Sequence, residues 1–209
     1  MLQLGVIAVG FAVQIIAFRA VATGRYSLWT LTGPVLAATG LVAALVRPPI
    51  ATGRVSAVAA VAAGVSAALA LYLGTLAFVA VAARWEVFRS QVADQYGRAG
   101  EVSLALALAL AILLAVPGEE LFWRGLVQPR LQRSLPTLTG PALAWLGYVA
   151  ANAASGSLPL TAGAVVGGAV WGGLALWTRG VLASVLCHAT WTGLMLIHPP
   201  ASARVVMRG

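Results

Sequence analysis

The stretch Val102–Gln128, VSLALALALAILLAVPGEELFWRGLVQ, places three charges inside apolar sequence. Seventeen uncharged residues precede Glu119 and Glu120, and Arg124 follows after three apolar residues. A charged side chain at the centre of a membrane helix costs about 2.5 to 3.5 kcal/mol, so three unpaired charges would cost roughly 8 to 10 kcal/mol. Charges retained against such a penalty indicate a functional site in which they find partners.

The composition is that of an integral membrane protein. Of the 209 residues, 61% are hydrophobic and only 9% are charged, whereas soluble domains carry about 25% charged residues. The net charge of +8 comes entirely from arginines, which lie mostly between apolar runs, as is typical of residues that contact lipid headgroups. This distribution argues against nucleic-acid binding and predicts the lipid bilayer as a partner. Abundant Ala, Gly, Val and Arg without Lys is typical of a GC-rich bacterial genome, and we expect a multi-pass protein of the bacterial plasma (inner) membrane.

The apolar runs predict an all-α polytopic membrane helix bundle with a single membrane domain over residues 1–209. A span needs about 20 apolar residues, which gives about seven transmembrane helices, with a range of six to eight. The polar segment Arg84–Glu101 between them predicts a solvated connector with a short amphipathic helix. Alternate loops share the arginines almost evenly, so the membrane orientation stays open. The predicted spans are Leu2–Ala22, Tyr26–Val46, Val55–Ala83, Val102–Gln128, Leu138–Ala153, Leu160–Trp177 and Val181–Ile197.

Helix breakers flank the charged motif. Pro117 and Gly118 predict a break or kink directly before the glutamates, and Pro129 predicts the next boundary. Glu119 and Glu120 would then lie in the first turn of a helix, where the helix dipole favours carboxylates.

Helical spacing separates the roles of the two glutamates. Glu120 and Arg124 are spaced i,i+4, which predicts an ion pair on one helix face. Glu119 points about 100° away and has no opposite charge in its own segment. We therefore expect Glu120 to be structural and Glu119 to be an acid–base group. A purely structural Glu–Arg pair between helices is the alternative, but it does not account for Glu119.

The run Glu119–Gly125, EELFWRG, resembles the EExxxR signature of the CPBP family. These are intramembrane proteases that include type II CAAX prenyl proteases and bacteriocin-processing enzymes. The resemblance continues through a glycine-rich span to a late motif at His188, so residues 102–198 are expected to form the CPBP-like core helices. It implies an endopeptidase that hydrolyses a peptide bond in a peptide or membrane-protein substrate. For a bacterial member, we expect peptide maturation, bacteriocin immunity or membrane-protein quality control.

The family pattern implies a role for each matching residue. Glu119 would be the base that activates water, Glu120 and Arg124 would be its supporting pair, and His188 would be an oxyanion donor. The chain has no HExxH motif, and His188 would be the single nitrogen ligand at the site. We therefore predict no cofactor and no obligatory zinc.

Two positions depart from the family pattern. Asn152 stands where the family has a middle histidine, four residues after the aromatic Tyr148, and Thr192 stands where it has a late Asn or Asp. Asn152 can position water or donate a hydrogen bond but cannot accept a proton near neutral pH, whereas Thr192 keeps a hydroxyl donor. Loss of one general acid–base group lowers a rate by about 10²- to 10⁴-fold, so a weakened protease is expected.

Two other functions stay open. A catalytically impaired relative would act as a membrane scaffold or as a peptide-binding or immunity protein, and Asn152 and Thr192 favour this alternative. A small proton-coupled transporter would use Glu119 as its relay, but the chain shows no internal repeat of the kind found in many transporters.

Overall fold

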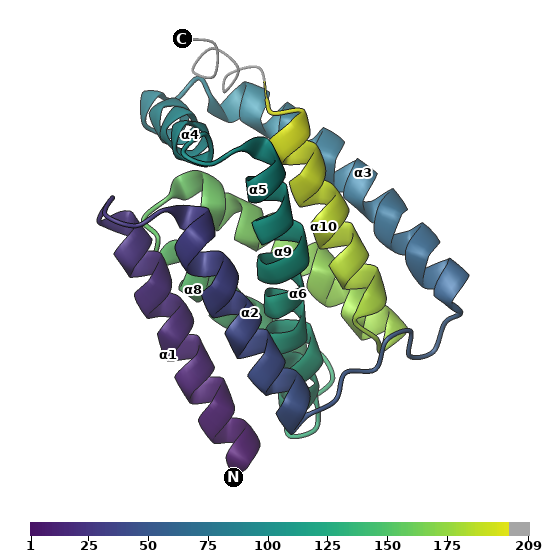
Figure 1. Cartoon of the computed structure of the whole chain (residues 1–209). Helices are drawn as coiled ribbons and strands as arrows, with labels where there is room; N and C mark the ends of the chain where they lie inside the picture. Colours follow the sequence, from purple (N-terminus) through teal and green to yellow (C-terminus); the bar gives the residue numbers. More distant parts are fainter. Residues whose placement is uncertain (201–209) are drawn as a thin grey trace.

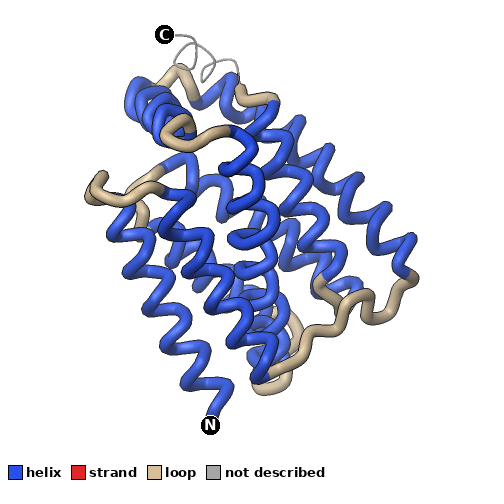
Figure 2. The backbone as a smooth tube through the Cα atoms, viewed as in Figure 1, coloured by secondary structure: helices blue, strands red, loops and turns tan. Residues whose placement is uncertain are grey.

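The computed structural model describes residues 1–200, which fold as a bundle of helices (Figure 1, Figure 2). Within this range no strand is present, and five helices are long and apolar enough to cross a membrane. The predicted fold class is therefore confirmed. Residues 201–209, the end of the predicted domain, lie outside the described residues. The helices outside the central segment are α1 (Leu2–Ala22), α2 (Leu28–Val46), α3 (Ala57–Ala82), α4 (Glu86–Ala99), α8 (Thr139–Ala153), α9 (Leu158–Thr178) and α10 (Leu182–Ile197).

Each predicted span is a helix whose ends agree with the prediction to within four residues. Helices α8 and α10 contain 15 and 16 residues, fewer than the roughly 20 of a full span. Local sequence also sets several helix starts, because a serine hydroxyl accepts a hydrogen bond from the amide three residues later. These capping serines are Ser56, Ser103 and Ser157.

The charged motif lies in one continuous helix, Leu104–Gln132, of 29 residues. The predicted break at Pro117 and boundary at Pro129 are therefore wrong, whereas a kink at Pro117 stays a prediction. The glutamates lie in mid-helix rather than at a helix N-terminus. Two π-helical segments flank them, and their wider turns allow a membrane helix to accommodate a proline. In order, the elements are α5 (Leu104–Ala109), η1 (Leu110–Ala115), α6 (Val116–Glu120), η2 (Leu121–Val127) and α7 (Gln128–Gln132).

Gly118 makes room for a neighbouring helix rather than ending its own. A Cβ atom on Gly118 would lie 2.2 Å from the carbonyl oxygen of Leu36, and one on Gly40 would lie 2.5 Å from the Cα atom of Gly118. The two glycines thus allow the backbones of α2 and α6 to touch, as small residues commonly do in membrane bundles.

The central helix runs through the middle of the bundle. Helix α1 packs along α2 on one side of it, and α10 packs along α3 on the other (Figure 1). Its middle part contacts α2, α9 and α10. The glutamates are therefore surrounded by helices, and their side chains are buried.

Helix α4 lies across one end of the bundle (Figure 1). The predicted amphipathic helix is present, and it buries Phe88, Val92 and Tyr96 against the ends of α3 and α10. The Tyr96 hydroxyl donates a hydrogen bond to the carbonyl oxygen of Met195 at 3.1 Å. Burial, with a smaller contribution from Tyr72, raises the pKa of Tyr96 above its ordinary value, so this hydroxyl stays a donor.

Candidate active site

Glu120 and Arg124 form a buried ion pair in the central helix. Arg124 Nη1 donates a hydrogen bond to Glu120 Oε1 at 3.1 Å, and the two side chains are 2% and 0% exposed. The i,i+4 pair predicted from the sequence is therefore present. His188 Nδ1 of α10 lies 3.0 Å from the same oxygen. Glu120 thus connects the central helix to α10.

The same face of the central helix is joined to α9 through backbone carbonyls. Arg124 Nη2 donates to the carbonyl oxygen of Gly168 at 3.0 Å, and Gln128 Nε2 donates to that of Gly172 at 3.1 Å. Both donors and both acceptors are four residues apart, so the contacts repeat once per helical turn. The two hydrogen bonds thus tie the central helix to α9 at successive turns.

Glu119 points to other partners, as the helical spacing predicts. Its Oε2 atom accepts a hydrogen bond from the Tyr148 hydroxyl of α8 at 3.2 Å and lies 3.9 Å from His188 Nε2. The Glu119 residue is 6% exposed and lines a cavity. The two adjacent carboxylates thus have different environments, one paired with a guanidinium and one at a cavity wall.

His188 is held at its Nδ1 atom and at its ring face. The imidazole stacks on Trp171 with ring centroids 3.6 Å apart and an angle of 13° between the planes. Nδ1 faces the ion-paired carboxylate of Glu120, which can only accept a hydrogen bond, so Nδ1 is the nitrogen that donates. Nε2 faces Glu119 and can exchange a proton.

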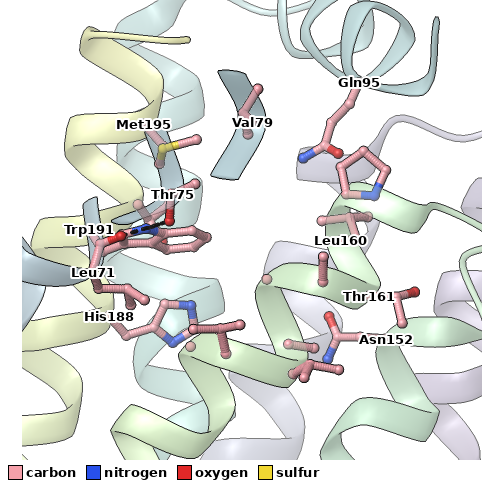
Figure 3. Close-up of a pocket in the computed structure, with 18 of the residues that line it drawn as sticks. Leu71, Thr75, Val79, Gln95, Asn152, Leu160, Thr161, His188, Trp191 and Met195 are labelled. Atoms are coloured by element: carbon pink, nitrogen blue, oxygen red, sulfur yellow. Dashed lines mark hydrogen bonds between the residues drawn. The ribbon is translucent and has the colours of Figure 1, made fainter. Parts of the chain in front are cut away.

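A cavity of about 1180 Å³ with a mostly apolar lining begins at these groups. Figure 3 shows His188 and Asn152 on facing walls at one end, and Gln95 of α4 at the other end. Glu119 and Trp191 also line it. A pocket of this size, largely apolar with a few convergent polar groups, is typical of ligand-binding and active sites.

Asn152 and Thr192 line the same cavity as Glu119 and His188. Asn152 Nδ2 donates a hydrogen bond to the backbone carbonyl of Tyr148 at 3.1 Å, and Thr192 lies one turn after His188 on α10. Within residues 1–200, neither side chain makes a hydrogen bond to Glu119 or His188. The structure therefore brings together four of the six predicted site residues, whereas the roles predicted for Asn152 and Thr192 stay predictions.

The sequence pattern did not identify two aromatic residues at the site. Tyr148 entered only as the aromatic position of a motif, and Trp171 had no specific role in the prediction. The hydroxyl of Tyr148, one helical turn before Asn152, was the available signal for the first. Nothing in the local sequence distinguishes Trp171 from the chain's other tryptophans.

A metal site is not apparent in the described part of the chain. Among residues 1–200, no group of three or more His, Cys, Asp and Glu side chains is arranged to hold a metal ion. The absence of a cofactor stays a prediction.

Residues 101–194 match the family model of the type II CAAX prenyl endopeptidase Rce1-like proteins. The matched segment contains the two glutamates, Arg124, Tyr148 and His188. The resemblance to CPBP intramembrane proteases is therefore confirmed for this part of the chain. No curated protein and no solved structure matches the chain. Together with the apolar helices, the match to a membrane-protease family indicates a multi-pass membrane protein. The bacterial plasma membrane stays a prediction.

Proposed function

We propose that this protein is an intramembrane endopeptidase in which Glu119 activates a water molecule for attack on a peptide bond. The observation that carries the proposal is the meeting of Glu119 and His188 at 3.9 Å on the wall of a large cavity inside a membrane bundle. Residues 102–198 would be the catalytic core within a single membrane domain.

Proton accounting at the site supports this chemistry. The charges of Glu120 and Arg124 compensate each other, so the proposed mechanism assigns the working proton to Glu119 and His188. With that proton on His188, Glu119 is a carboxylate that can act as a general base. The Nε2–H group of His188 is then a donor that can stabilise an oxyanion. One proton thus supplies both functions.

The proposed reaction needs no further group. The water oxygen bonds to the carbonyl carbon of the substrate while its proton passes to Glu119, and the Nε2–H of His188 stabilises the resulting oxyanion. Glu119 then gives the proton to the leaving nitrogen as the C–N bond breaks. The products are a carboxyl and an amine, and Glu119 is again ready to accept a proton.

The cavity supports a peptide or membrane-protein substrate. Its lining is mostly apolar, and Glu119 and His188 are among its few charged or polar groups. A substrate would place one carbonyl beside these two residues and apolar side chains along the remaining walls.

Cleavage by the reconstituted protein tests the proposal. The full chain in proteoliposomes is incubated with a library of membrane-anchored peptides, and products are identified by mass spectrometry. We expect cleavage by the wild type and by Glu86→Gln, whose side chain is exposed on α4, and loss of cleavage in Glu119→Gln and His188→Ala. Cleavage retained in a folded Glu119→Gln variant contradicts the proposed mechanism.

A scaffold or peptide-binding protein is the second candidate. Asn152 supports this candidate, because its amide donates to the backbone of Tyr148. Unlike the histidine of the family pattern, it cannot act as a second base beside Glu119. Peptide binding without cleavage by any variant in the same library would favour this candidate.

A further inference from the structure

We propose that Tyr148 is the residue that positions Glu119, and that its hydroxyl sets the orientation in which the carboxylate activates water. The inference rests on the proposed function, because it assigns the support of the same base. Tyr148 would thus supply support for Glu119 in a site where position 152 holds an asparagine.

The contact that carries the inference lies between α8 and the central helix. The Tyr148 hydroxyl donates to Glu119 Oε2 at 3.2 Å, and the two residues are 3% and 6% exposed. Within residues 1–200, no other side chain donates a hydrogen bond to Glu119, since His188 Nε2 stands 3.9 Å away. The hydroxyl therefore fixes which carboxylate oxygen is held and which is left for water.

The ring of Tyr148 is itself held from several sides. The guanidinium carbon of Arg124 lies 4.5 Å from the ring centroid, a distance that allows a cation–π contact. Trp123 and Trp171 contact the ring edge to face at centroid distances of 5.8 and 6.1 Å. A Cβ atom on Gly168 would come within 2.8 Å of Tyr148 Cδ1, so this glycine provides the space for the ring. A side chain confined in this way is a preorganised support for another group.

Asn152 cannot replace this support in the arrangement observed. Its amide nitrogen donates to the backbone carbonyl of Tyr148, one turn earlier on α8. The hydrogen bond holds the Asn152 side chain against its own helix, on the cavity wall opposite His188 (Figure 3). Tyr148 is thus the one residue of α8 that reaches the free glutamate.

A positioning role predicts a loss of turnover rather than of binding. Misplacing a reacting group by about 1 Å costs on the order of 100-fold in rate, so Tyr148→Phe should lower kcat about 10- to 100-fold. Tyr148 transfers no proton in this scheme and contributes little to substrate binding, so KM should stay within about twofold of the wild-type value.

The kinetic experiment uses the full chain in proteoliposomes and a fluorogenic version of a peptide cleaved in the library screen. Four forms are compared: wild type, Tyr148→Phe, Asn152→His and the double variant. We expect a smaller effect of Tyr148→Phe when histidine is present at position 152, because an imidazole there can share the support of Glu119 or its water. The matched control is Tyr72→Phe, which also removes a tyrosine hydroxyl donor. That hydroxyl donates to the backbone carbonyl of His198, and Tyr72 does not line the cavity, so kcat should be unchanged.

Infrared difference spectroscopy gives a second readout that needs no turnover. The carboxyl band of Glu119 is identified by its loss in Glu119→Gln, and it should shift in Tyr148→Phe but not in Tyr72→Phe. An unshifted band in Tyr148→Phe overturns the positioning role. So does a wild-type kcat in Tyr148→Phe while Glu119→Gln is inactive, a result that leaves the proposed function standing. Full activity in Glu119→Gln overturns both proposals.

Discussion

Replacing Arg124 by methionine tests whether the buried ion pair stabilises the fold. The substitution keeps a long side chain but leaves the carboxylate of Glu120, which is 0% exposed, without its guanidinium. Breaking a buried pair by removing one partner costs about 3 to 5 kcal/mol. The lost hydrogen bond to the Gly168 carbonyl adds about 1 kcal/mol. We therefore expect Arg124→Met to lower the free energy of unfolding by about 4 to 6 kcal/mol.

Equilibrium unfolding in mixed detergent micelles with increasing SDS measures this difference. The matched control is Arg89→Met, which breaks an i,i+3 pair with Glu86 whose side chains are 53% and 73% exposed. Exposed pairs contribute at most about 1 kcal/mol, so this variant should be nearly neutral. The double variant Glu120→Gln, Arg124→Met should regain more than half of the lost stability, because no buried charge is then unpaired. Losses of equal size in Arg124→Met and Arg89→Met would refute this reasoning.

Three further predictions concern the packing around the site. Gly118→Ala should lower the free energy of unfolding by about 1 to 3 kcal/mol, because the new Cβ would lie 2.2 Å from a carbonyl oxygen of α2. The control Gly74→Ala has nothing within 4 Å of its new Cβ and should be near neutral in the same unfolding assay. Equal effects would contradict the close approach of the two helices. Gln14→Leu removes the acceptor of the 2.9 Å hydrogen bond from Trp123 Nε1 and should cost about 1 to 2 kcal/mol; unchanged stability would show that this bond contributes nothing. Cys187, fully buried, should react with a maleimide only as the protein unfolds, and rapid labelling of the folded form would contradict its burial.

The spans and the charged pair could be predicted because their causes are local. A bilayer requires runs of apolar residues, so the ends of α1 in the sequence and in the structure coincide at Leu2 and Ala22. The pair of Glu120 and Arg124 follows from one helix with i,i+4 spacing. These inferences need no knowledge of which helices are neighbours.

The predicted break at Pro117 and Gly118 failed because its deciding contacts are distant in the sequence. Gly118 meets Gly40 of α2, and this close approach between helices accounts for the glycine. The contact of Tyr148 with Glu119 is also long range, 29 residues apart, and joins two helices whose relative rotation the spacing does not fix. Spacing predicts which residues share a helix face, but only packing determines what that face meets.

The adjacency of the two glutamates has a geometric explanation. A second carboxylate three or four residues from Glu120 would share its helix face and compete for the same guanidinium. Placed next to it, Glu119 is turned by about 100° and meets the Tyr148 hydroxyl of α8 instead of Arg124. His188 reaches both carboxylates, with Nδ1 toward Glu120 and Nε2 toward Glu119. One helical turn thus holds a neutralised carboxylate that orients the imidazole and a free carboxylate that can exchange a proton with it.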